Sequence, residues 1–162
     1  MGVIDRCSRL RHSSSCSRTE ELGLAFDIHP ISDANSALLD MVAPDVFDSP
    51  IHPQMLAAFC NQPSHFMAVA TIDRLVVGQV RAILHLSPDE PAVLYIDNLG
   101  VTPKHKRKGI ARALMQSALE WGHARGARSF WVATEIDNAE ARAFYASLSL
   151  DEQPVAYFEG RI

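Results

Sequence analysis

Apolar positions along the chain form several short runs that predict β-strands. Residues 22–28 (LGLAFDI) predict a first strand that Pro30 closes. Two runs rich in apolar and β-branched residues, FMAVATI and LVVGQVRAIL, flank the two-residue turn Asp73-Arg74 and predict a hairpin. After two prolines, AVLYIDNLGV predicts a further strand. SFWVATE and PVAYFEG predict the last two strands.

Helical signals alternate with these runs. Ser32 or Asp33 caps a predicted helix that extends through Val42, and a second short helix is expected from Pro53 through Cys60.

The third and fourth predicted helices lie in the second half of the chain. One helix is predicted by an apolar stripe made of two sets of residues, each at a spacing of four: Ile110, Leu114 and Ala118, and beside them Ala111, Met115 and Leu119. Gly122 and Gly126 mark the end of this helix. Asp137 or Asn138 caps a helix through Leu148 that buries Phe144. This order of strands and helices predicts an α/β (α+β) class, with helices packed on a mixed sheet.

Composition narrows the class of protein. A chain of 162 residues with 48% hydrophobic and 21% charged residues fits one soluble domain. We expect a flexible polar tail over residues 1–20 and a domain over residues 21–162. A net charge of −4 gives no general attraction to nucleic acid or to anionic membranes. Three cysteines, without a CxxC pair, predict neither a disulfide framework nor a metal site, and the expected compartment is the cytoplasm.

The segment KHKRKGIA, residues 104–111, joins a predicted strand to a predicted helix. The first amides of a helix lack internal acceptors and lie at the positive end of its dipole, so such a junction can bind phosphate oxygens. Gly109 lets the backbone approach a phosphate closely, and the basic side chains add attraction. There are two alternatives to a phosphate site: a solvated turn, or a nucleic-acid-binding patch that also uses the arginines of the tail.

The same junction resembles the acetyl-CoA-binding motif of the GNAT superfamily of N-acetyltransferases, Arg/Gln-x-x-Gly-x-Gly/Ala. Lys106 departs from the first position, whereas Gly109 and Ala111 match the other two. A second likeness follows in ATEIDNAEARAFYASLSL, which resembles the Asn-x-x-Ala-x-x-Phe-Tyr helix of the superfamily. The resemblance implies one mostly antiparallel sheet of six or seven strands, flanked by about four helices, with splayed central strands.

The resemblance also implies cofactor-binding residues. Leu99 and Val101 would pair with the pantetheine arm of acetyl-CoA, and an amide near Leu99 would polarise the thioester carbonyl. Asn138 would also bind this arm, and Tyr145 would bind the cofactor and protonate the departing thiolate. The remaining expected cofactor-binding residues are Gly100, Lys106, Arg107, Lys108, Gly109, Ile110, Ala111 and Arg112.

A carboxylate must take the proton of the attacking amine. Asp97 on the strand beside the thioester is the first candidate, and Glu135 on the neighbouring strand is the second. Asp45 and Asp48 in APDVFDSP follow; like Asp97, they are candidates for binding a cationic substrate. No nucleophilic cysteine is needed, and Cys60 is expected in the core. His65, His85 and His105 are expected at the surface or in packing, and Trp121 and Trp131 in the core.

Within the superfamily, FMAVATIDRLVVGQV, YIDNLGV and VAYFE most resemble aminoglycoside 3-N-acetyltransferases. The implied reaction is acetyl transfer from acetyl-CoA to a primary amine of a small molecule by direct attack in a ternary complex, without a metal. The alternatives are a non-catalytic acetyl-CoA sensor or interaction module, or acetylation of a protein or peptide amine. No nucleic acid or membrane partner is expected, and a homodimer is compatible with the sequence.

Overall fold

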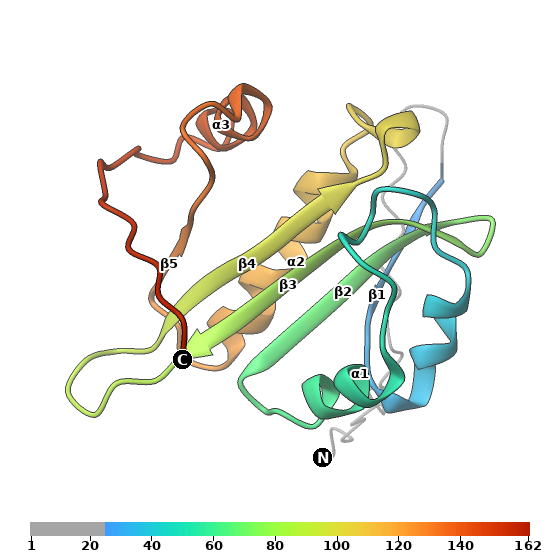
Figure 1. Cartoon of the computed structure of the whole chain (residues 1–162), viewed down its shortest axis with the longest axis horizontal. Coiled ribbons are helices and arrows are strands. Elements are labelled where there is room, and N and C mark those ends of the chain that lie inside the picture. Colours follow the sequence, from blue (N-terminus) through green and yellow to red (C-terminus); the bar gives the residue numbers. More distant parts are fainter. Residues whose placement is uncertain (1–24) are drawn as a thin grey trace, which may run out of the picture. The chain divides into compact units, whose positions relative to one another are not determined.

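A computed structural model describes residues 25–162, so the predicted tail and the first residues of the predicted first strand, 22–24, lie outside the described part. The elements are β1 (Asp27–Pro30), the 3-10 helix η1 (Asp33–Asp40), α1 (Pro53–Cys60), β2 (His65–Ile72), β3 (Leu75–His85), β4 (Val93–Val101), the 3-10 helix η2 (Pro103–His105), α2 (Ile110–Ala124), β5 (Ser129–Val132) and α3 (Ala139–Ala146) (Figure 1). The chain divides into two compact units, the first ending at Trp131 and the second spanning Val132–Ile162.

The sheet has five strands in the order β1-β2-β3-β4-β5, and the first four form an antiparallel meander. The predicted hairpin is confirmed, because β2 and β3 pair directly up to Ile72 opposite Leu75. Its turn places Asp73 at φ 48° and Arg74 at φ 68°. Two left-handed central residues define a type I′ turn, whose twist matches that of the strands it joins.

Helix α2 packs on one face of β2–β4 through the apolar stripe that its sequence predicts. The buried residues of the helix are Ile110, Leu114, Met115, Ala118 and Gly122. Close approach depends on glycines from both sides. A Cβ on Gly122 would lie 2.9 Å from Leu94 Cδ2, and one on Gly78 would lie 3.2 Å from Leu114 Cδ1. This face of the sheet is called the helix face below.

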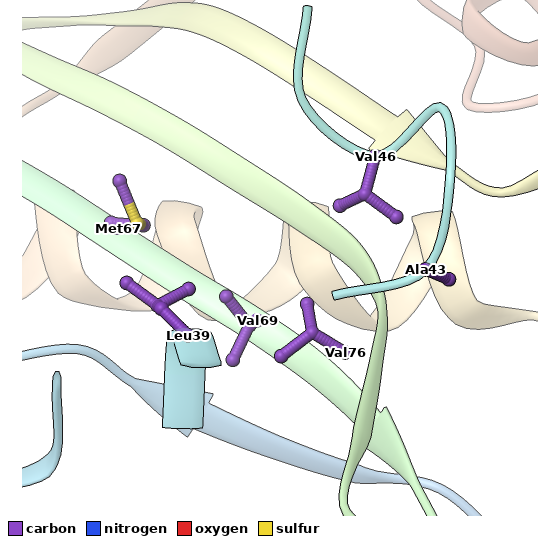
Figure 2. Close-up of a cluster of buried hydrophobic side chains, with 6 residues drawn as sticks. All are labelled: Leu39, Ala43, Val46, Met67, Val69 and Val76. Carbon is purple, nitrogen blue, oxygen red and sulfur yellow. The ribbon is translucent and has the colours of Figure 1, made fainter. Parts of the chain in front are cut away.

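The other face of the sheet is covered by η1 and the segment that follows it. Figure 2 shows six buried side chains of this layer, with α2 on the far side of the strands. They come from η1, from the loop after it and from β2 and β3: Leu39, Ala43, Val46, Met67, Val69 and Val76. Half-buried side chains of α1, including Leu56 and Phe59, pack against this cluster. This second face is called the loop face.

Five strands in the described residues are fewer than the six or seven expected, although the class is as predicted. PVAYFEG forms no strand: Val155, Tyr157 and Phe158 are 83%, 84% and 90% exposed. Pro154 has no N–H with which to form a hydrogen bond to a neighbouring strand. Strand β5 is also shorter than predicted, since it ends at Val132 rather than Glu135.

The predicted helices are present, and two of them end earlier than predicted. α1 begins and ends as expected, whereas α3 stops at Ala146 rather than Leu148, and η1 is a 3-10 helix that ends at Asp40 rather than Val42. The cause at η1 is local. Asn35 has a non-helical φ of −129°, and its side chain accepts from the Ser32 amide and donates to the Pro30 carbonyl. Side chains that bond nearby backbone in this way compete with α-helix formation.

Replacing Gly78 with alanine should destabilise the protein by about 1–3 kcal/mol, because the added methyl overpacks the contacts of β3 with β4 and with α2. Its Cβ would lie 3.0 Å from the Gly100 carbonyl oxygen and 3.1 Å from Val101 Cγ2. Urea unfolding measures the free energy. Gly160→Ala is the control, since nothing lies within 4 Å of a Cβ there. Equal stability of the two variants would contradict the packing described.

Candidate functional site

A bulge interrupts β4 at Asp97. Arg81 is opposite Asn98 and Ala82 is opposite Ile96, so Asp97 is the extra residue on β4. Ile96 is buried, whereas Asp97 and Asn98 both reach side chains of β3 on the loop face. A bulge can place two consecutive side chains on one side of a sheet and is common beside active sites. The first candidate for the base, Asp97, is therefore set out of the regular ladder.

Two polar pairs cross from β3 to β4 at this bulge. Arg81 Nε lies 3.2 Å from Asp97 Oδ2, and Gln79 Nε2 donates to Asn98 Oδ1 at 2.5 Å. Gln79 is only 1% exposed, and its Oε1 has no hydrogen-bond partner among residues 25–162. A buried acceptor without a donor is costly, which is typical of a position that a ligand or water completes. Gln79, Arg81 and Asn98 are not among the residues predicted for the site, although the polar residues Gln79 and Arg81 at alternate positions of the apolar run LVVGQVRAIL were a usable signal.

The turn between β4 and α2 is hydrogen-bonded to the sheet, and its backbone is concave. Thr102 is 5% exposed, and its N–H donates to the Val77 carbonyl at 2.9 Å. Arg107 has φ 61° and Gly109 has φ 80°, while Lys108 between them is not left-handed. Alternation of this kind is typical of concave turns whose successive amides bind an anion.

Gly109 is the N-cap of α2 and faces open space. Its carbonyl accepts from Ala113 at 3.0 Å, so the amides of residues 110–112 form the first turn, which has no acceptor within the helix. No atom lies within 4 Å of a Cβ built on Gly109. Lys106, Arg107 and Lys108 are exposed beside it, and Lys108 Nζ lies 3.4 Å from His105 Nδ1.

The predicted cofactor residues at positions 99–101 and 106–112 thus lie at the end of β4 and along the turn and first turn of α2. The neighbouring strand covers only part of this edge of β4. Nine residues in β4 extend about 30 Å and four in β5 about 13 Å. The contacts of β5 are with the beginning of β4: Arg128 N–H donates to the Ala92 carbonyl at 3.1 Å, and Trp131 stacks on Tyr95 at 4.2 Å.

A pocket of about 340 Å³ opens on the loop face, over β2 and β3. Its walls are the segment after Val46, helix α1 and one residue from each strand: Phe47, Asp48, Ser49, Pro50, Ile51, His52, Met55, Leu56, Phe59, Met67 and Arg81. Arg81 connects the pocket to the bulge through Asp97. Of the two aspartates expected in the early loop, Asp48 lines this pocket, whereas Asp45 occupies a turn at φ 62° outside its walls.

The other predicted residues belong to the second unit. Asn138 caps α3, where its Oδ1 accepts from the Ala141 amide at 3.0 Å. Glu135 is not on a strand as expected, because β5 ends at Val132. It is exposed, in a turn closed by a 3.0 Å bond from the Asn138 amide to its carbonyl. Tyr145 is half-buried, with its ring 5.4 Å from that of Phe144.

Burial raises the pKa of Tyr145 above its ordinary value of 10.0. The phenol therefore stays protonated at neutral pH, which is the form that a general acid needs. Burial, and then the charge of Asp33, also raises the pKa of Cys60. That thiol is half-buried at the end of α1 and is a poor nucleophile.

Trp131 corrects one expectation, since it is 45% exposed at the edge of the sheet rather than in the core. Trp121 is half-buried and stacks on Phe66 at 5.1 Å. The three histidines lie as expected, at the surface or in packing, with His65 against Phe59 and His85 beside Tyr95.

Residues 25–162 offer neither a membrane-spanning helix nor a group of metal ligands. None of the helices there combines the length and the apolar character that crossing a membrane requires. Within the same residues, His, Cys, Asp and Glu side chains do not gather in groups of three or more that could hold a metal ion.

Comparison with known proteins identifies the class of this fold and site. Residues 35–149 match the Acetyltransferase (GNAT) family, and the chain belongs to that family.

Individual relatives match shorter stretches. The chain is 34% identical over 102 residues to the acetyl transferase GW6a of Oryza sativa subsp. japonica, covering 56% of this chain and 24% of that protein. It is 33% identical over 58 residues to the [ribosomal protein bS18]-alanine N-acetyltransferase of Escherichia coli strain K12, covering 36% and 39%. The matches thus span between about a quarter and two fifths of these curated relatives.

Solved structures share the fold over most of the chain. An aminoglycoside acetyltransferase, HMB0005, from an uncultured soil metagenomic sample superimposes with a TM-score of 0.71 at 26% identity, covering 85% of this chain and 98% of that one. AAC(6′)-Iy in complex with a bisubstrate analogue, CoA-S-monomethyl-acetylneamine, has a TM-score of 0.70 at 18% identity, covering 85% and 99%. At that identity the likeness to AAC(6′)-Iy concerns the fold alone.

The raised pKa of Tyr145 predicts how stability depends on alkaline pH. The folded state holds the phenolic proton more tightly than the unfolded state, so this contribution is complete below pH 10 and is lost as pH rises through the folded pKa. Tyr145→Phe should therefore lose less stability than the wild type between pH 9 and pH 11. Urea unfolding at both values measures the difference, and parallel losses in the two proteins would show that Tyr145 is not held protonated by burial.

Proposed function

We propose that this protein transfers an acetyl group from acetyl-CoA to a primary amine by direct attack within a ternary complex. The observation that carries the proposal is the junction of β4 and α2, where Gly109 caps the helix at φ 80° with open space before it. Membership of the Acetyltransferase (GNAT) family supports the same reaction class.

The junction suits the pyrophosphate of CoA. Amides of residues 110–112 and the curved turn at Arg107–Gly109 offer donors, and three exposed cations beside them add charge. The pantetheine arm then runs along the β4 edge of residues 97–101, pairing with backbone groups of Leu99 and Val101 as an added strand would. In support, AAC(6′)-Iy, which shares this fold, was crystallised with CoA itself as well as with the CoA analogue. Asn138 of the second unit is proposed to bind the pantetheine arm while it caps α3.

The chemistry proceeds in one addition and one elimination. The amine nitrogen attacks the thioester carbonyl carbon, and an amide near Leu99 stabilises the oxyanion that forms. A carboxylate accepts the proton that nitrogen loses. The C–S bond then breaks as the C=O bond reforms, and the thiolate takes a proton from Tyr145, whose phenol burial keeps neutral. After product release, the carboxylic acid gives its proton to solvent and the phenolate of Tyr145 takes one from solvent, so both groups return to their starting forms.

Asp97 is the carboxylate we assign as the base, acting directly or through water. It occupies the bulge two residues before Leu99, and Arg81 holds one of its oxygens at 3.2 Å. Glu135 and Asp48 are the alternative bases. Asp48, in the pocket that Arg81 shares, is better suited to attract the cationic form of the amine, and Asp45 is a weaker candidate for that role.

Named relatives differ in acceptor. AAC(6′)-Iy carries the 6′ position in its name, and the rice and Escherichia coli proteins are an acetyl transferase and a ribosomal-protein alanine N-acetyltransferase. The sequence resemblance to 3-N-acetyltransferases therefore stays a prediction about the position modified. A small-molecule amine remains our proposed acceptor, because the pocket is of small-ligand size. The protein or peptide amine and the non-catalytic sensor are the alternatives.

Replacing Gly109 with valine should weaken CoA binding by at least about tenfold, because a branched side chain would occupy the space where the phosphate approaches. Gly126→Val is a matched control: Gly126 has φ 92°, ends the same helix and is equally open. Both variants should lose similar stability from backbone strain. Calorimetry with CoA should separate them, and equal affinities would show that the phosphate site lies elsewhere.

Tyr145→Phe tests whether the protein turns over acetyl-CoA. An enzyme that uses this phenol as its acid should lose about 10²–10⁴-fold in kcat, while CoA affinity barely changes. Release of CoA thiol during acetylation of an amine panel reports the rate. A wild type that binds CoA but acetylates no amine would favour the sensor.

A further inference from the structure

The pocket on the loop face is mostly apolar. Six apolar side chains line it, and they come from the loop before α1, from α1 and from β2: Phe47, Ile51, Met55, Leu56, Phe59 and Met67. Met67 is buried at the base, whereas Met55 is 73% exposed at the rim. Water against such a concave apolar surface is unfavourable, and an apolar ligand body would displace it. Methionine side chains adapt readily to a ligand's shape.

The ionisable groups of the pocket are few. Asp48 and His52 are exposed at its rim, and Arg81 is half-buried at its base. Asp97 Oδ2 lies 3.2 Å from Arg81 Nε, so the guanidinium charge is balanced from within the sheet. Asp48 is thus the one acidic residue among those that line the pocket, and a single carboxylate matches a ligand with a single positive charge.

The pocket also lies next to the proposed reaction centre. Arg81 follows Val80, and Val80 is the residue opposite Leu99 in the β3–β4 register. Asp97 joins the two sites, because it contacts Arg81 and sits in the bulge before Leu99. A ligand body held in the pocket would therefore lie close to the bulge.

We infer that the acceptor is a monoamine with an aromatic or branched aliphatic body, and not a polycationic aminoglycoside. The inference rests on the proposed acetyl transfer and names its substrate class. The apolar walls hold the body and Asp48 attracts the ammonium group before it loses its proton. An aminoglycoside would bring several ammonium groups and many hydroxyls against methionine and phenylalanine side chains, where they would lose water without gaining partners.

A panel of four acceptors tests this with the full chain and saturating acetyl-CoA. The amines are 2-phenylethylamine, L-phenylalanine, kanamycin and a peptide with an N-terminal alanine. We expect kcat/KM for 2-phenylethylamine to exceed each of the others by about tenfold or more, since a charged or strongly hydrated body gains little in an apolar pocket. Phenylalanine differs from 2-phenylethylamine only by a carboxylate, so that pair isolates any recognition of acid by Arg81.

Two variants locate the binding to this pocket. Met55→Ala should raise KM for 2-phenylethylamine about fivefold by removing methylene contacts with the bound ligand, with kcat little changed. Its control is Gln54→Ala, the preceding residue of α1, which is exposed and outside the pocket. Asp48→Asn should raise KM about threefold, the effect of one exposed charge, and Asp40→Asn, an exposed aspartate outside the pocket, should not.

Each other outcome overturns the inference in a distinct way. Kanamycin used as well as or better than 2-phenylethylamine leaves acetyl transfer intact and rejects the apolar monoamine. If phenylalanine is the preferred acceptor, Arg81 binds a substrate carboxylate. If the peptide is preferred, the acceptor is a protein amine. Unchanged KM in both pocket variants would place the acceptor elsewhere. If no amine is acetylated although CoA binds, the proposed function fails together with the inference.

Discussion

The pairing of β3 with β4, and its interruption at Asp97, determines how the polar residues of the candidate site are arranged. Regular alternation up to Ile96 directs apolar side chains to α2, and the extra residue Asp97 then shifts the register. Because of that shift, two successive polar residues, Asp97 and Asn98, face Arg81 and Gln79 on the loop face. Without the bulge, one of them would point into the apolar layer under α2, where a carboxylate or an amide would lack partners.

The same strand also separates the two halves of the proposed reaction. Its end leads through Thr102, which is bonded to β3, into the turn and the N-terminus of α2. Its bulge leads through Arg81 to the pocket over β2 and β3. In the proposed reaction, phosphate binding would depend on backbone amides of the turn and α2, whereas acceptor binding would depend on side chains of the early loop and α1.

Several elements were predictable because local chemistry and tertiary packing agree. Asp73-Arg74 forms the hairpin turn, Pro53 begins α1, and the apolar stripe from Ile110 faces the sheet. Asn138 caps α3 as expected. The failures have physical causes too. PVAYFEG has the alternation of a strand but no neighbour to pair with among the described residues, and Asn35 side-chain bonds hold η1 in a 3-10 conformation.

What the sequence determined by itself is the junction proposed to bind the cofactor, since a basic turn, a glycine and an amphipathic helix follow one another within a dozen residues. Local geometry is enough there: the glycine allows φ 80°, and the helix supplies its own free amides. The pocket was decided only by tertiary structure. Phe47, Phe59, Met67 and Arg81 lie far apart in sequence, and their meeting depends on the register of β2, β3 and β4 and on the loop that crosses them. Contacts between distant segments carry no local signal, so the aspartate that lines the pocket, Asp48, could not be told from Asp45 until the fold placed them.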